Sequence, residues 1–189
     1  DGGRFLADAA KRGAIAAVVG GQVVGSAALP VLRVEDSVEA LQALAREHRK
    51  ALRGTVIAIT GSNGKTTTKD MVHHVLAKGA KAARSQKSFN NHIGVPLTLL
   101  SAVPGDDFVV VEVGTNHPGE IARLAAIVRA SIAVVTNVAE SHLGGLGNIE
   151  GVAREKEALV EALPHEGIAV LNIDNEHVRR MAERATSRT

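Results

Sequence analysis

The stretch from Thr55 to Thr68, TVIAITGSNGKTTT, constrains the fold most, because it joins a β-branched apolar run to a glycine-rich turn that ends in lysine and hydroxyl residues. The run predicts a buried strand over 56–60, followed by a turn in which Gly61 and Gly64 let backbone N–H groups point at phosphate oxygens. A helix that starts directly after the turn offers its unpaired N–H groups to an anion. The stretch therefore predicts a phosphate-binding loop, with a purely structural glycine turn as the alternative.

Two side chains at the end of the turn complete this pattern. Lys65 is expected to reach the β- and γ-phosphates of ATP, and Thr66 to place its hydroxyl on Mg²⁺. The full Walker A pattern is not met, because Ile59 stands where its first glycine belongs. The strand, turn and helix context is nevertheless retained. The residues expected to bind the nucleotide here are Gly61, Ser62, Asn63, Gly64, Lys65, Thr66 and Thr67.

Composition narrows the class of protein. The 189 residues are 45% hydrophobic, which is enough for a sizeable core in one domain or two small ones. A net charge of only +2 and the lack of Trp and Tyr argue against nucleic-acid binding. Because there is no cysteine, metal ligands must be oxygen or histidine, and a reducing cytoplasmic location is expected. Residues 13–32 carry no charge, but glycines and Pro30 interrupt them, so two strands are expected and not a membrane span.

The pattern along the chain predicts two domains with a boundary at Arg53 and Gly54. Residues 1–53 are expected to form a small first piece, with a short helix, strands over 14–19 and 31–34, and a helix from 36 to 51. In residues 54–189 strands alternate with helices, which predicts an α/β fold with a doubly wound, mostly parallel sheet. Its strands are expected at 56–60, near 82, and at 108–113, 132–136 and 168–171, and its helices at 66–78, 121–129, 150–163 and 175–184.

Two local expectations concern the region after the phosphate loop. The helix over 66–78 is expected to turn Met71, Val75 and Leu76 toward the core. The polar, turn-rich segment from Ser88 to Pro96 is interrupted by apolar residues, which predicts a shaped loop.

Polar residues at the carboxyl ends of parallel strands are candidates for the site, because ligands of open α/β sheets bind at that edge. Glu112, Asn137 and His142 follow this rule and are expected in the same crevice as the triphosphate. A carboxylate and an imidazole next to ATP suit a metal ion. Each has an alternative reading, since Glu112 could pair with a neighbouring lysine and His142 could lie exposed in a glycine-rich loop.

For two further residues, Lys156 and Asn91, the local sequence by itself predicts a structural role and not a functional one. Lys156 stands in a charged run, Arg154 to Glu157, that is typical of a solvated helix face. Asn91 and its neighbour Asn90 are typical of a turn stabilised by side chain to backbone hydrogen bonds.

Several segments together resemble the Mur ligases in order and spacing. The segments are TGSNGKTT over 60–67, NNHIGVP over 90–96, EVGTNHPGEI over 112–121, Thr136-Asn137 with His142-Leu143, and AREKE over 153–157. The resemblance runs almost from end to end, and within the family it is strongest to the branch that adds D-alanyl-D-alanine to UDP-N-acetylmuramoyl-tripeptide.

This resemblance implies roles for particular residues. Lys65 would contact the phosphates, Thr66 and Glu112 would bind one Mg²⁺, and His142 and Lys156 would bind a second. Lys156 would carry a carbamate, which turns the cation into an anionic oxygen ligand. Asn91 would lie near the triphosphate, although the register of the two asparagines is ambiguous.

The resemblance also implies an activity and partners. The family forms a peptide bond with ATP through an acyl phosphate in the synthesis of the peptidoglycan precursor, and it acts as a cytoplasmic monomer without a membrane span. Residues 1–53 would be the latter part of the small α/β N-terminal domain that holds the UDP-sugar substrate, and 54–189 a truncated central ATP-binding domain. The C-terminal domain of the family would be absent, so we expect this stretch alone not to ligate. A ligase that adds the third amino acid, folylpolyglutamate synthase, or a nucleotide-binding module without catalysis remain as alternatives.

Overall fold

The computed structural model describes residues 2–21, 29–141 and 143–189. Two units, Asp1–Ala43 and Leu44–Thr189, each make most of their contacts internally. The division falls inside helix α2 (Ser37–Ala51) and therefore before the predicted boundary at Arg53. Asp36 begins this helix as expected, because its Oδ1 accepts hydrogen bonds from the N–H groups of Val38 and Glu39.

The first unit holds a small parallel sheet. A 3₁₀ turn (η1, Gly2–Phe5) leads into helix α1 (Leu6–Lys11), and strand β1 (Ala17–Gly20) pairs with β2 (Val31–Val34) in parallel. Both predicted strands of the uncharged stretch are therefore present, whereas residues 22–28 lie outside the described part. Within 2–21, 29–141 and 143–189, no helix combines the length and the apolar character needed to cross a bilayer.

The second unit is built on a five-stranded parallel sheet in the order β4-β5-β3-β6-β7. Its strands are β3 (Thr55–Thr60), β4 (Ala82–Arg84), β5 (Phe108–Glu112), β6 (Ile132–Val135) and β7 (Ile168–Leu171). The strand that leads into the glycine-rich turn is the central one, flanked by β5 and β6. The predicted α/β fold with a parallel sheet is confirmed.

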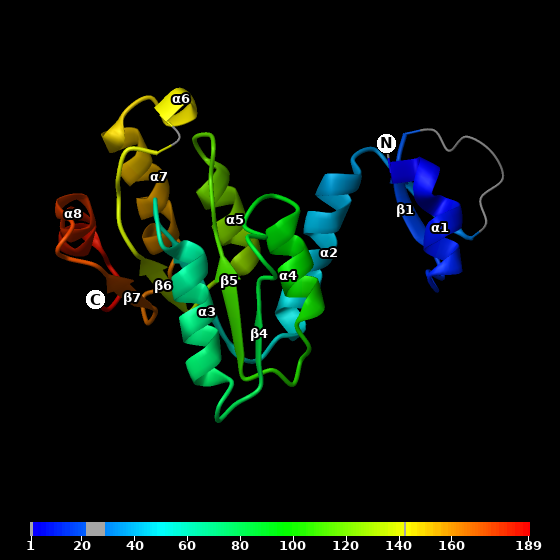
Figure 1. The fold of residues 1–189 in the computed structure, drawn as a ribbon, viewed down its shortest axis with the longest axis horizontal. Coiled ribbons are helices and arrows are strands. Elements are labelled where there is room, and N and C mark those ends of the chain that lie inside the picture. Colours follow the sequence, from blue (N-terminus) through cyan, green and yellow to red (C-terminus); the bar gives the residue numbers. More distant parts are fainter. Residues whose placement is uncertain (1, 22–28, 142) are drawn as a thin grey trace. The chain divides into compact units, whose positions relative to one another are not determined.

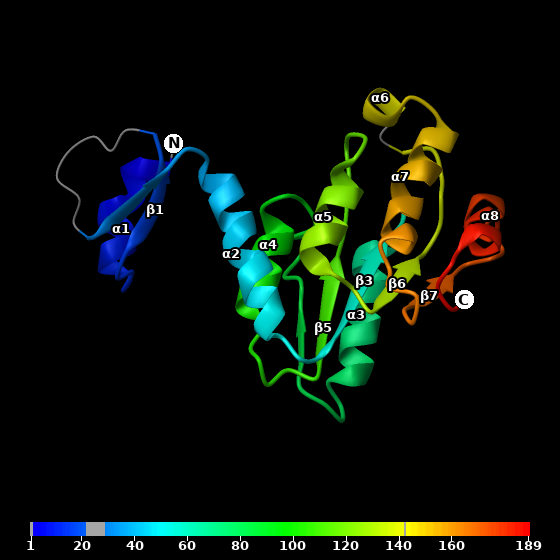
Figure 2. The same ribbon diagram turned by 180° about the vertical axis from the view of Figure 1, so that it is seen from behind.

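Helices cover both faces of this sheet, as Figures 1 and 2 show from opposite sides. Helix α3 lies on one face, and α4, α5 and α7 lie on the other. The bounds are α3 (Lys65–Leu76), α4 (Gly94–Ser101), α5 (Glu120–Val128), the short α6 (Leu143–Leu146), α7 (Ile149–Glu161) and α8 (Glu176–Arg184). Because all five strands run parallel to one another, their carboxyl ends lie at the same edge of the sheet.

The side of α3 that faces the sheet differs from the prediction. Val72 and Leu76 pack against the buried residues of β3 and β5. Met71 and Val75 are 64% and 67% exposed, so their predicted inward orientation is wrong. The reason is the helical period, since residues spaced three or four apart share a face and the buried face also contains Lys69.

The segment predicted as a loop over Ser88 to Pro96 is partly helical. Helix α4 begins at Gly94, and Asn91 Oδ1 accepts hydrogen bonds from the N–H groups of Gly94 and Ile93. Pro96 lies in the first turn, where its missing N–H costs no intrahelical hydrogen bond. A short buried helix with a weak amphipathic pattern gives little sequence signal.

Candidate functional site

The glycine-rich turn follows the central strand directly and requires its two glycines. Gly61 has φ +150°, and a Cβ atom there would lie 1.9 Å from the Oγ1 of Thr136. Gly64 has φ +79°, in the left-handed region, and precedes the first residue of α3. The predicted strand, turn and helix arrangement is therefore present, and it directs the N-terminus of α3 toward the turn.

The turn is tied to the residues that follow β6. Ser62 Oγ donates a hydrogen bond to the carbonyl oxygen of Ala139 at 2.9 Å, and the N–H of Asn63 donates to Asn137 Oδ1 at 2.9 Å. Thr136 Oγ1 donates to the carbonyl of Asn63 at 2.6 Å. These bonds fix the shape of the turn, and they place Asn137 beside it, as its position at a strand end predicted.

Lys65 begins α3 and reaches back over the turn. Its Nζ donates hydrogen bonds to the carbonyl oxygens of Gly61 at 2.9 Å and Ser62 at 3.4 Å. Burial lowers the pKa of Lys65, and the nearby Glu112 carboxylate partly opposes this. The cation therefore lies at the turn, while Thr67 of the same helical turn is exposed.

Glu112 ends β5, beside the strand that carries the turn, and its side chain is 1% exposed. Thr66 Oγ1 donates to Glu112 Oε2 at 2.9 Å, and Asn90 Nδ2 donates to Oε1 at 2.8 Å. A hydroxyl and a carboxylate in contact at the helix N-terminus are the hard oxygen donors that Mg²⁺ prefers. A lysine also lies nearby, since Lys69 Nζ is 3.8 Å from Glu112 Oε2. Sequence reasoning missed Lys69.

The two adjacent asparagines have different surroundings. The side chain of Asn90 contacts Glu112, whereas that of Asn91 accepts N–H groups at the start of α4. The Gly114 N–H also donates to the carbonyl of Asn90 at 2.8 Å. The structure therefore places Asn90 beside the carboxylate, and a role for Asn91 toward the nucleotide stays a prediction.

Lys156 does not lie on a solvated face. It is 2% exposed in the middle of α7. Burial, followed by the positive charge of Lys65, lowers the pKa of Lys156 to about 8, while Glu155 opposes the shift. The default reading of the charged run as a solvated face is wrong, because Glu155 and Glu157 are buried as well.

Both glutamates that flank Lys156 have specific partners that the sequence did not reveal. Glu155 accepts the N–H groups of Gly119 and Ile121, each at 2.7 Å, and so caps the N-terminus of α5. Glu157 accepts a bidentate pair from Arg184 of α8 at 2.7 and 2.9 Å. Helix α7 is therefore fixed to two neighbouring helices on either side of Lys156.

His142, the other predicted ligand on the Lys156 side, lies outside the described residues. In the described ranges no three His, Cys, Asp or Glu residues form a group that could hold a metal. The structure thus brings together Lys65, Thr66 and Glu112 with Asn90, and it places Lys156 close enough to Lys65 for their charges to interact.

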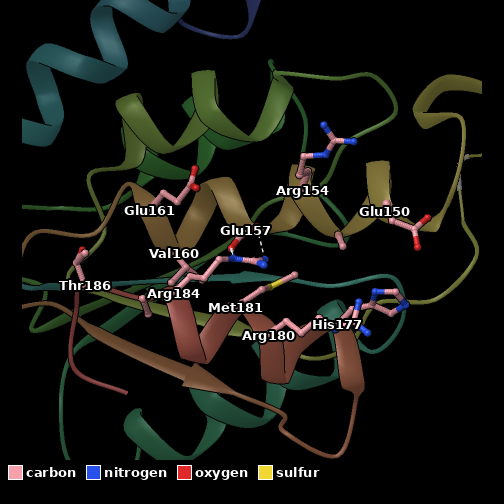
Figure 3. A pocket seen from close by; sticks show the side chains of 12 residues that line it. Glu150, Arg154, Glu157, Val160, Glu161, His177, Arg180, Met181, Arg184 and Thr186 are labelled. Atoms are coloured by element: carbon pink, nitrogen blue, oxygen red, sulfur yellow. Dashed lines mark hydrogen bonds and ion pairs between the residues drawn. The ribbon is translucent and has the colours of Figure 1, made fainter.

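A groove of about 720 Å³ lies away from these residues, between α7 and α8. Figure 3 shows Arg184 crossing it toward Glu157, with Arg154, Arg180 and His177 along its length. No residue of the glycine-rich turn lines it. The turn and Glu112, and not this groove, therefore form the candidate site.

Comparison with known proteins places these features in a family. Residues 59–189 match the model of the Mur ligase middle domain. The UDP-N-acetylmuramoyl-tripeptide--D-alanyl-D-alanine ligase of Escherichia coli (strain K12) is 40% identical over 147 residues, which cover 78% of this chain and 32% of that enzyme. The enzyme of the same name from Synechocystis sp. is 38% identical over 185 residues, covering 97% of this chain and 41% of the relative.

Solved structures of ligases from the same family are also similar to this chain. MurF from Acinetobacter baumannii aligns with a TM-score of 0.89 and 31% identity, covering 100% of this chain and 42% of that one. MurF ligase from Thermotoga maritima in complex with ADP gives a TM-score of 0.85 and 32% identity, with coverage of 98% and 43%. E. coli FolC, at 21% identity and a TM-score of 0.57 over 80% of this chain and 45% of that one, shows a shared fold alone.

The match includes the glycine-rich turn, Glu112 and Lys156, which all lie within residues 59–189. The chain spans between 32% and 41% of the length of the two curated relatives described above. Its strand order, its phosphate-type turn and its similarity along this length lead to one conclusion: the chain belongs to the Mur ligase family.

Proposed function

We propose that the chain is part of an ATP-dependent ligase that joins D-alanyl-D-alanine to UDP-N-acetylmuramoyl-tripeptide in peptidoglycan precursor synthesis. The observation that carries the proposal is the contact between Thr66 and Glu112 beside Lys65, in a chain whose curated relatives bear the name of that ligase. A cytoplasmic location and a monomeric state belong to the same proposal. So does the assignment of residues 1–53 to the domain for the UDP-sugar substrate and of 54–189 to the ATP-binding domain.

In the proposed reaction the tripeptide carboxylate attacks the γ-phosphate of ATP, and ADP leaves. The amine of D-alanyl-D-alanine then attacks the acyl phosphate, inorganic phosphate leaves, and the amine loses a proton. Mg²⁺ would neutralise charge on the transferring phosphoryl group. Lys65 and the N–H groups of Gly61 to Thr67 would bind and orient the phosphates, and Thr66 and Glu112 would hold the cation.

A second cation is proposed to bind at Lys156 and His142. The buried position and the lowered pKa of Lys156 support this, because only a neutral amine takes up carbon dioxide to form a carbamate and release a proton. The carbamate would give this side of the site an anionic oxygen. Asn91 is retained as a candidate for the nucleotide side, together with Asn90.

Titration calorimetry of ATP with and without Mg²⁺ tests the nucleotide site. We expect Mg²⁺-dependent binding that Lys65→Met and Glu112→Gln both weaken. Lys78→Met is the matched control, because Lys78 is an exposed lysine just after α3. ATP binding that survives the loss of Glu112 and Lys156 with the same Mg²⁺ dependence would favour a nucleotide-binding module without catalysis.

Gentle native mass spectrometry in bicarbonate tests the Lys156 side. We expect an adduct of the mass of carbon dioxide that is absent from Lys156→Met. If no adduct forms under conditions that preserve carbamates, Lys156 has no part in metal binding.

A further inference from the structure

Lys69 is a buried lysine for which neither the phosphate contacts nor the proposed metal ligands account. It lies one turn beyond Lys65 on the same helix, and its side chain is 0% exposed. An ammonium group is costly to remove from water unless opposite charge and hydrogen-bond acceptors surround it. Its partners therefore indicate what it does.

Three oxygen atoms surround Lys69 Nζ. It donates a hydrogen bond to the carbonyl oxygen of Lys87, and it lies 3.5 Å from Asp70 Oδ1 and 3.8 Å from Glu112 Oε2. Asp70 also pairs with Arg84 of β4. Asp70 thus has a second cation, whereas among the described residues the only ion pair of Glu112 is with Lys69.

The hydrogen bond to Lys87 supports the turn that carries Asn90. Lys87 has φ +49°, a left-handed conformation that is unfavourable for a residue with a side chain. Three residues later, Asn90 donates to Glu112 Oε1, while its own carbonyl accepts the N–H of Gly114. Lys69 therefore contacts Glu112 by charge and also holds the turn whose asparagine binds the other carboxylate oxygen.

We propose that Lys69 is a positioning residue that orients the Glu112 carboxylate for a divalent cation, through its charge at Oε2 and through the Lys87–Asn90 turn at Oε1. The inference rests on the proposed function, since it takes Glu112 as the ligand of Mg²⁺. A hydrocarbon chain of the same shape would pack equally well at this place. It would leave the Lys87 carbonyl without its donor and would remove the one ion pair that Glu112 makes among the described residues.

The distance to Glu112 fits this role. At 3.8 Å the ammonium attracts Oε2 without forming a hydrogen bond to it, whereas Thr66 Oγ1 donates to the same oxygen at 2.9 Å. A carboxylate oxygen has room for more than one partner. Lys69 thus orients the carboxylate while leaving an electron pair for a cation.

The test compares Lys69→Met with Lys78→Met, which removes the same charge from an exposed position just after the same helix. The measured quantity is the Mg²⁺ concentration that gives half-maximal enhancement of ATP binding, together with ATP affinity in the presence of EDTA. Loss of a residue that orients a metal ligand typically weakens metal binding about 10- to 100-fold. We expect a rise of this size for Lys69→Met, with ATP affinity in EDTA and the Lys78→Met values unchanged.

Several outcomes would overturn the inference. An unchanged Mg²⁺ midpoint in Lys69→Met leaves the proposed function standing and removes the positioning role. An equal loss of ATP affinity with and without Mg²⁺ shows a general structural role instead. If the unsubstituted chain binds ATP without any dependence on Mg²⁺, or does not bind it, the proposed function fails and this inference fails with it.

A double variant covers the case in which Lys69→Met does not fold. In Lys69→Met the buried Glu112 carboxylate has lost its ion pair. Glu112→Gln removes that negative charge as well, so we expect the double variant Lys69→Met/Glu112→Gln to regain cooperative unfolding. If the double variant is also unfolded, Lys69 is needed for the fold independently of Glu112, and the inference is wrong.

Discussion

Glu112 and Lys156 are both buried charged residues near the same edge of the sheet, but their surroundings differ. Glu112 has a counter-charge in Lys69 and hydrogen-bond donors in Thr66 and Asn90. The charges that influence Lys156 are a second cation, Lys65, and Glu155, whose oxygens already accept backbone N–H groups.

This difference shows two ways of keeping an ionisable group out of water. The carboxylate is matched by partners that suit its charged form. The pKa of the Lys156 amine falls to about 8, which makes its neutral form accessible near physiological pH. The first arrangement suits a direct metal ligand, and the second suits an amine that is to be modified.

The largest expected effect comes from Glu155, which lies beside Lys156 and fixes its helix to α5. Glu155→Ala leaves the N–H groups of Gly119 and Ile121 without their acceptor. Unsatisfied buried groups cost about 1–3 kcal/mol each, so we expect the free energy of unfolding to fall by about 4 kcal/mol. Urea denaturation followed by circular dichroism measures this change.

Glu161→Ala is the control for this experiment. Glu161 is the exposed last residue of the same helix, so its replacement should change the free energy of unfolding by less than about 0.5 kcal/mol. Similar values for the two variants would contradict the capping role of Glu155.

The second prediction concerns the pH dependence that the lowered pKa of Lys156 creates. The ordinary pKa of lysine is 10.5, and that of Lys156 in the folded chain is about 8. Between these values the unfolded chain binds more protons, so the free energy of unfolding rises with pH. We expect a rise of about 3 kcal/mol across this window relative to Lys156→Met.

The measurement is denaturant unfolding from pH 7.5 to 10.5 in buffer purged of carbon dioxide, so that the free amine is observed. The difference between the unsubstituted chain and Lys156→Met cancels the titration of the other lysines. If the two stability curves run parallel, Lys156 has an ordinary pKa and the contrast with Glu112 disappears.

The third prediction has the smallest expected change in stability. It distinguishes the roles of Asn90 and Asn91, the two asparagines near Glu112. Asn91→Ala removes an acceptor at the start of α4 and should lower the free energy of unfolding by about 1 kcal/mol. Asn90→Ala removes a donor to Glu112 and should have its main effect on the Mg²⁺ midpoint of ATP binding, about tenfold. A larger shift of that midpoint for Asn91→Ala than for Asn90→Ala would show that the register is the opposite one.

The strands and the glycine-rich turn could be predicted from the sequence because their signals are local. A β-branched run followed by Gly61 and Gly64 specifies a strand and a tight turn by its own conformational preferences. Glu112 could be found for a similar reason, since a polar residue at the end of a buried strand is conspicuous.

The partners of these residues could not be predicted, because they depend on contacts between distant segments. Val72 and Leu76 share a helix face with Lys69, but an apolar face is not expected to hold a lysine, and placing Met71 and Val75 inward put Lys69 on the wrong side of its helix. Glu155 and Glu157 form an ordinary charged pattern until α5 and α8 are in place. A functional role for Lys156 is predicted by resemblance alone.

The central position of β3 also bears on how the chain is made. This strand ends at residue 60, but its neighbours β5 and β6 begin only at Phe108 and Ile132, and the glycine-rich turn is held by residues as late as Ala139. On the ribosome, β3 must therefore wait for partners that emerge on the order of seconds later. The phosphate-type turn takes its final shape late in synthesis, and until then the apolar strand has two unpaired edges that can pair with other chains.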